Sequence, residues 1–115
     1  KPMADANAFR AERIRQYIDT HYYLPLTLTH IAQQLGVSTR HATAIFKEKY
    51  HMTPMQYVAE ARVSVAKKLL LETDKDIISI GFEVGYESLT TFYRVFKSHA
   101  MMTPSQFRQQ RSKEL

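Results

Sequence analysis

Two short stretches of the chain combine Arg, Lys and Thr side chains, which donate hydrogen bonds to anions and to planar acceptors. One contains Thr39, Arg40, Thr43 and Lys47, and the other contains Thr90, Thr91, Arg94 and Lys97. Each set predicts a polar, basic surface that lacks the aromatic anchors of a protein-binding hot spot. These side chains are therefore suited to binding an anionic partner.

Histidines and carboxylates do not form a metal or catalytic centre in this sequence. No pair among His21, His30, His41, His51 and His99 has the i, i+4 spacing of zinc ligands, and the chain has no Cys. Paired carboxylates, Gly-rich phosphate loops and nucleophile–base constellations are also absent. The sequence therefore predicts neither an enzyme nor a cofactor or metal site.

The composition is that of an ordinary folded chain with a basic balance. Its 115 residues, 44% of them hydrophobic, suffice for one domain or two very small ones. The net charge of +5 favours a polyanionic partner, either nucleic acid or an anionic membrane face. The sequence contains neither an apolar run of about 18 residues nor a signal peptide, so we expect a cytoplasmic location and no membrane partner.

Helix signals begin at the N-terminus. Residues 6–20 form an apolar stripe of 3.6 periodicity, and Pro25 ends that helix. The stripe consists of Phe9, Ile14, Tyr17 and Ile18. Thr27 can cap a short helix that ends at Gly36, and Ser38 can cap the next one. Because helices separated by three residues cannot remain collinear, these two must cross steeply.

A repeated segment marks two further helix starts. The stretch FKEKYHMTPMQY begins at Phe46, and FKSHAMMTPSQF begins at Phe96. In each copy a Thr precedes Pro, and a Gln three residues after the Thr can reach back to complete a capping box. The helix starting at Pro54 continues to about residue 72, which makes it about 27 Å long. We expect it to act as a spacer.

The repeat extends upstream of these caps. Ile31, Leu35 and Gly36 correspond to Ile80, Val84 and Gly85, and each set is followed by a capping Ser and a second helix. A small residue at the crossing, a Gly in the turn and apolar residues inside the second helix indicate a helix-turn-helix. Both copies have this pattern. The first is Ile31, Ala32, Leu35, Gly36, Val37, Ala42 and Ile45, and the second is Ile80, Gly81, Val84, Gly85, Tyr86, Phe92 and Val95.

Residues 24–110 resemble the C-terminal DNA-binding domain of the AraC/XylS family of bacterial transcription regulators. The resemblance rests on IAQQLGVSTRHATAIFKEKYHMTPMQYV, RVSVAKKLL and IISIGFEVGYESLTTFYRVFKSHAMMTPSQFR. It implies an all-α fold of about seven helices, with two helix-turn-helix subdomains joined by a long linker helix. The expected divisions are 1–23 for the N-terminal helix, 24–53, 54–72 for the linker and 73–115.

The same resemblance implies which residues contact DNA. They are Ser38, Thr39, Arg40, Thr43, Ala44 and Lys47 in the first unit, and Ser88, Leu89, Thr90, Thr91, Arg94 and Lys97 in the second. Arg40 and Arg94 suit guanine edges, and the Thr methyl groups and Leu89 suit thymine methyl groups. The chain departs from the family pattern at Gly81, where Ala is usual, and at His51 and Met101. These last two residues carry mild strain if their turns are left-handed.

The implied function is sequence-specific binding of double-stranded DNA in successive major grooves, which regulates bacterial transcription, most naturally as an activator. Such a protein acts in the bacterial cytoplasm at the nucleoid, and the resemblance implies RNA polymerase as a second partner. An effector or dimerisation domain is expected outside this segment. The alternative is a helical protein–protein interaction module.

Overall fold

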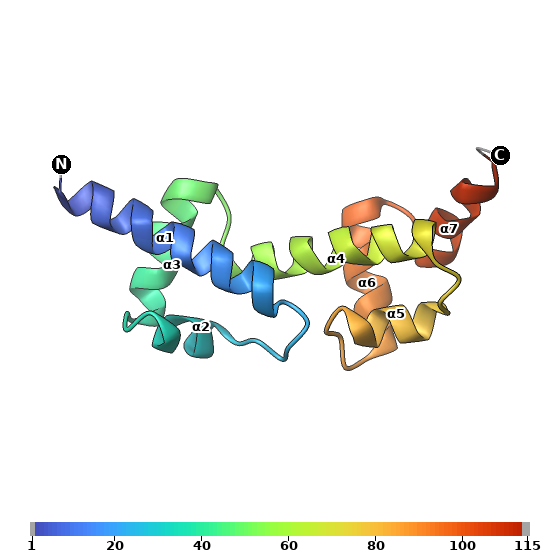
Figure 1. Cartoon of the computed structure of the whole chain (residues 1–115), viewed down its shortest axis with the longest axis horizontal. Helices are drawn as coiled ribbons and strands as arrows, with labels where there is room; N and C mark the ends of the chain where they lie inside the picture. Colours follow the sequence, from blue (N-terminus) through green and yellow to red (C-terminus); the bar gives the residue numbers. More distant parts are fainter. Residues whose placement is uncertain (1, 114–115) are drawn as a thin grey trace. The chain divides into compact units, whose positions relative to one another are not determined.

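The computed structural model describes residues 2–113, and all regular secondary structure within them is helical (Figure 1). The seven helices are α1 (Pro2–His21), α2 (Leu28–Gln34), α3 (Thr39–Tyr50), α4 (Pro54–Glu72), α5 (Ile77–Glu83), α6 (Leu89–Ala100) and α7 (Pro104–Lys113). This confirms the predicted fold class. The chain divides into two compact units, residues 1–58 and 59–115, with the division inside α4.

The first unit is built around α1 and α3. The two helices pack against each other, and α2 packs on α3. Ile14, Ile18, Ile31 and Phe46 are fully buried between them. Phe9 is a correction to the predicted stripe: it is 60% exposed, and Ala11 is the buried residue in that part of α1. Periodicity places residues on one face of a helix, but here the neighbouring helices cover only part of that face.

The second unit has a more aromatic core. Phe92 and Phe96 of α6 are fully buried, and their ring centres lie 5.8 Å apart. Tyr86 lies 5.7 Å from Phe92, and Phe107 of α7 lies 5.7 Å from Phe96. Phe96 meets Phe92 and Phe107 edge-to-face, which strengthens a core beyond its buried area, and the Tyr86 ring is tilted against Phe92. This cluster supports α6 from behind.

The predicted capping boxes are present at both MTP segments. The Thr53 amide donates to Gln56 Oε1 at 2.8 Å, and the Gln56 amide donates to Thr53 Oγ1 at 3.2 Å. Thr103 and Gln106 repeat the pair at 2.9 and 3.2 Å. Each box satisfies two amides that a helix start leaves unpaired, so α4 and α7 begin at their Pro residues.

The residues that end α3 and α6 are left-handed, which is the case in which the sequence implies mild strain. His51 and Met101 both have φ of 62°, and each amide donates to the carbonyl of the Lys four residues earlier at 2.8 Å. Side chains other than Gly adopt this conformation at a cost. The turns between the helices of each motif use Gly36 at φ 67° and Gly85 at φ 115°.

Candidate nucleic-acid interface

Helix α3 has a buried side and a polar, mostly exposed side. Ser38 caps it, with Oγ accepting from the His41 amide at 3.0 Å. Its buried residues are Ala42, Ile45 and Phe46. The predicted residues Arg40, Thr43, Ala44 and Lys47 follow i, i+3, i+4 and i+7 spacing, which places them on one face of the helix. Thr43 is half-buried and the other three are exposed, while Thr39 opens the helix beside them.

Helix α6 repeats this arrangement. Ser88 caps it, with Oγ accepting from the Thr91 amide at 3.3 Å. The exposed residues Thr90, Arg94 and Lys97 have the spacing of one face, opposite Phe92 and Phe96. Leu89 and Thr91 are half-buried at the margins of that face. Each unit therefore presents a polar face on the second helix of its motif.

The register between the two helices changes one part of the sequence interpretation. Helix α3 begins at 39 and α6 at 89, and both have 12 residues, so equivalent positions are 50 apart. Arg40 is then equivalent to Thr90, and Arg94 to Ala44. The two arginines share a face, but they lie one turn apart and cannot make equivalent contacts.

Sequence reasoning also left out one residue of this face. Thr43 was included, but its equivalent, Tyr93, was not, although Tyr93 completes the i, i+3, i+4, i+7 set of α6. Tyr93 is half-buried, and its ring meets that of Phe92 edge-on at 6.1 Å. The constant offset of 50 residues between the two helices would have identified Tyr93 from the sequence. Conversely, the equivalent of Thr91 is His41, an exposed residue that had not been selected.

The cations on these faces differ from the cations that hold the fold together. Within the described residues, Arg40, Lys47, Arg94 and Lys97 make no ion pair, and all four are exposed. Exposed cations without internal partners can meet an anionic ligand without first breaking a contact. Lys47 and Lys97 lie in the last turn of their helices, where a positive charge is also favoured by the helix dipole.

A polar network fixes the far end of α3. The Arg15 side chain of α1 donates from Nε to the Tyr50 hydroxyl at 3.2 Å and from Nη1 to Asp19 at 2.7 Å. The Tyr57 hydroxyl donates to the other oxygen of Asp19 at 2.7 Å. Partial burial raises the pKa of Tyr57, as does its hydrogen bond to Asp19. The network ties α1, α3 and the start of α4 together, so it holds the orientation of α3.

Buried and half-buried arginines perform the same task in the second unit. The Arg62 guanidinium of α4 lies 5.0 Å from the ring centre of Tyr86, and only 9% of Arg62 is exposed. Burial raises the pKa of Tyr86, and the positive charge of Arg62 opposes that rise. From α7, Arg108 donates to the carbonyls of Leu70 and Thr73 at 3.1 and 3.2 Å. These contacts attach α4 to the core beneath α6 and to α7.

Two features are absent from the described part of the chain, a cluster of metal ligands and a membrane-spanning helix. Among residues 2–113 no three His, Asp or Glu side chains come together as metal ligands. None of the described helices is long and apolar enough to cross a membrane.

The chain is similar to known transcription regulators along most of its length. A family model described as a helix-turn-helix domain matches residues 31–110. Regulatory protein SoxS of Salmonella typhimurium is 32% identical over 93 residues, which cover 81% of this chain and 87% of SoxS. The crystal structure of a transcriptional regulator with an AraC-type DNA-binding domain, from Chromobacterium violaceum, is 29% identical, with a TM-score of 0.79 and 96% of each chain covered. The chain belongs to the AraC/XylS family.

A second relative shows that such a domain also occurs within longer proteins. The melibiose operon regulatory protein of Escherichia coli K12 is 29% identical over 100 residues, which cover 87% of this chain. The match covers only 33% of that protein, so the AraC/XylS domain described here spans about a third of its length. Family membership confirms the sequence-based recognition, and the residues that contact DNA stay a prediction.

Proposed function

We propose that this AraC/XylS domain binds double-stranded DNA sequence-specifically by placing α3 and α6 in the major groove, and that it thereby regulates bacterial transcription. The observation that carries the proposal is the duplicated polar face. Two helices, each the second of a helix-turn-helix, present hydroxyl and cationic side chains at the same spacing opposite a buried side. The second helix of such a motif is the one that reads base edges.

Some of these side chains suit base contacts, and others suit phosphate contacts that position the domain on DNA. Arg40 lies in the first turn of α3 and is exposed, so it can donate two hydrogen bonds to a guanine edge. Thr43 and Ala44 offer methyl groups to thymine, as do Leu89, Thr90 and Thr91 in the second unit. Lys47 and Lys97, together with the amides capped by Ser38 and Ser88, suit phosphates. Arg94 and Tyr93 lie deeper along α6 and are expected to give weaker base discrimination.

We further propose that α4 is the linker between two DNA-binding subdomains, 24–53 and 73–115, with residues 1–23 leading into the first. Its 19 residues correspond to about 28 Å of helix. Major-groove segments on one side of B-DNA recur about every 34 Å. A helix of this length is suited to joining two reading helices that occupy successive grooves.

The role we propose is non-enzymatic and sited at the nucleoid in the bacterial cytoplasm. Because the domain covers a third of the melibiose operon regulatory protein, we expect an effector or dimerisation domain elsewhere in a complete regulator. An activator also needs RNA polymerase as a partner. The names of both relatives, regulatory proteins, support a function in transcription.

Selection of bound duplexes from a random pool tests the proposal. We expect enrichment of a site with two conserved blocks about one helical turn apart. Recovery of no common sequence, with affinity that does not fall as salt rises, would instead favour the helical protein–protein module. That alternative has less support because the faces of α3 and α6 are cationic and hydroxyl-rich.

A further inference from the structure

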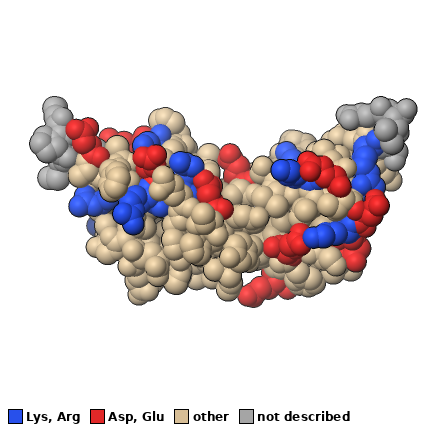
Figure 2. All heavy atoms as spheres, viewed as in Figure 1, with Lys and Arg blue, Asp and Glu red and all other residues tan. Residues whose placement is uncertain are grey.

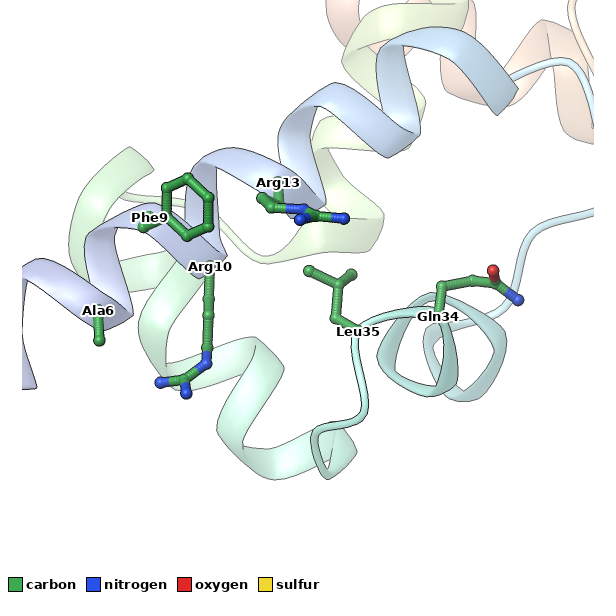
Figure 3. A pocket seen from close by; sticks show the side chains of 6 residues that line it. All are labelled: Ala6, Phe9, Arg10, Arg13, Gln34 and Leu35. Atoms are coloured by element: carbon green, nitrogen blue, oxygen red, sulfur yellow. The ribbon is translucent and has the colours of Figure 1, made fainter.

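The first unit has a hollow that its motif does not use. It lies between α1 and the end of α2, has a volume of about 320 Å³, and is lined by Ala6, Phe9, Arg10, Arg13, Gln34 and Leu35 (Figure 3). Leu35 points from the end of α2 toward α1, which carries Phe9 and the two arginines. The Arg13 guanidinium lies 5.9 Å from the Phe9 ring centre. The lining thus combines three apolar residues with two arginines and Gln34, and the hollow has room for a large apolar side chain that carries acidic neighbours.

The second unit has a projecting apolar pair, which we call the α5 knob: Ile78 and Phe82. They are 52% and 55% exposed and stand one turn apart on the outer face of α5. The duplicated motif shows that folding does not require them. Ile31 is equivalent to Ile80, an offset of 49, so the corresponding residues of α2 are Thr29 and Gln33. Both are exposed and polar in a helix that packs in the same way.

The chain around the knob is acidic, although the protein is basic. Residues 72–87 contain five carboxylates and one Lys, a formal charge of −4, so the rest of the chain carries +9 to reach the total of +5. All five carboxylates are exposed. Glu83 pairs with Lys75 at 2.7 Å and Asp74 with Arg111 at 3.2 Å, while Glu72, Asp76 and Glu87 make no ion pair with any described residue. Figure 2 shows acidic side chains bordering the surface over α5.

We propose that the hollow of one molecule receives the α5 knob of a second copy of this chain. The two surfaces complement each other in shape, since a hollow for one large side chain meets a projecting Phe, and in charge, since Arg10 and Arg13 meet a carboxylate-rich rim. Neither surface includes the polar faces of α3 and α6, so the contact leaves those faces uncovered. The inference rests on the proposed DNA-binding function.

The contact proposed is head-to-tail: the hollow of one copy takes the knob of the next, and the two copies do not exchange these contacts reciprocally. It therefore suits copies bound at sites repeated in the same direction along DNA. A stable dimer in solution buries about 1,200–2,000 Å² in total, far more than a knob of two side chains provides. On DNA, however, neighbouring sites hold the two copies at an effective concentration in the millimolar range, so a weak contact is enough.

The test compares duplexes that carry one selected site with duplexes that carry two in tandem, at several spacings on the same face of the helix. We expect the wild-type chain to bind the second site about tenfold more tightly than the first, equivalent to about 1.4 kcal/mol. The Ile78→Thr/Phe82→Gln variant, which installs the α2 residues, should bind a single site normally and lose the tenfold gain. Met101→Asn, which removes a residue that is 82% exposed and outside both surfaces, is the matched control and should retain the gain.

Mixing two variants tests whether the hollow and the knob contact each other. A Phe9→Ser/Arg13→Gln variant should also lose the gain, but a mixture of this variant with the knob variant should recover part of it. In one of the two orders on DNA, an intact hollow then faces an intact knob. Independent binding of wild-type chains to tandem sites, or a mixture no better than either variant, would overturn the inference. Failure of the wild-type chain to bind a single site would instead count against the proposed function.

Discussion

Gly81 and Phe92 form a size-matched pair, and enlarging Gly81 should destabilise the second unit. A Cβ atom at position 81 would lie 2.9 Å from Cδ2 and 3.1 Å from Cγ of Phe92. Carbon atoms pack best at about 3.5–4.0 Å, so the ring must move. It has little room, because Phe92 is fully buried and its ring lies within 5.7 Å of Tyr86 and 5.8 Å of Phe96.

The expected magnitude is a difference between two opposing effects. Ala is favoured over Gly in a helix by about 1 kcal/mol, whereas overpacking a filled core costs about 1–3 kcal/mol. Because the ring is held on several sides, we expect an overpacking cost of about 2 kcal/mol and a net loss of about 1 kcal/mol. The first unit avoids the conflict, since the equivalents of Gly81 and Phe92 there are Ala32 and Ala42.

Thermal unfolding followed by circular dichroism measures the effect. Gly81→Ala should lower the melting temperature of this unit by about 4–8 °C. In a Phe92→Ala background, which removes Cγ and Cδ2 and matches Ala42 of the first unit, the same substitution should become neutral or stabilising, because the crowding atoms are gone and the helix preference remains. Ser98→Ala, an exposed change in α6 of the same unit, controls for helix propensity. If Gly81→Ala melts at or above the wild-type temperature, the packing argument is wrong.

Three further outcomes are expected. Affinity for a selected site should fall about a thousandfold between 50 and 200 mM salt if about six phosphate contacts form. A salt titration at constant pH measures this fall. An affinity that does not change with salt would favour the protein-binding alternative. Arg40→Ala should cost about 1–3 kcal/mol on the preferred site and relax one or two base pairs, whereas Lys47→Ala should weaken all sequences alike and lower the salt slope by about one unit. An unchanged motif for Arg40→Ala would contradict its assignment to base reading. Met101→Gly should raise the free energy of unfolding in urea by up to about 1 kcal/mol, because φ at this residue is 62° and its side chain is 82% exposed. Ser98→Gly, within α6, should lower the free energy of unfolding by about 0.5 kcal/mol. If the two Gly substitutions change the free energy of unfolding equally, Met101 carries no backbone strain.

Helix boundaries were predictable because their causes are local. A Thr hydroxyl and a Gln amide three residues later cap a helix with little help from the rest of the chain, and both MTP boxes formed as expected. The left-handed residues His51 and Met101 were predictable for the same reason: a turn at that position imposes its conformation on whichever residue occupies it.

Contacts between distant segments were much less predictable. Phe9 fitted the apolar stripe, but its burial depended on which helices come to lie beside it, and they leave it 60% exposed. The arginines of α4 and α7 gave no sign in the sequence that Arg62 would be buried against Tyr86 or that Arg108 would bind the end of α4. The sequence shows that a residue is cationic, but it does not show whether the side chain faces solvent or binds a carbonyl.

The structure separates the cations that hold the fold from those that face solvent. A net charge of +5 predicts a polyanionic partner but not where it binds. Arg15 and Arg111, like Arg62 and Arg108, are held by rings, carbonyls or carboxylates within their own units, so their charge is already engaged. Arg40 and Arg94 are exposed, and both lie on the second helix of a duplicated motif, opposite its buried side. Lys47 and Lys97 occupy equivalent positions 50 residues apart and are both exposed, although the cores behind them diverged from Ala42 to Phe92. This repeated positive charge argues for the same kind of ligand at each helix, and a polyanion with a repeating groove would supply it.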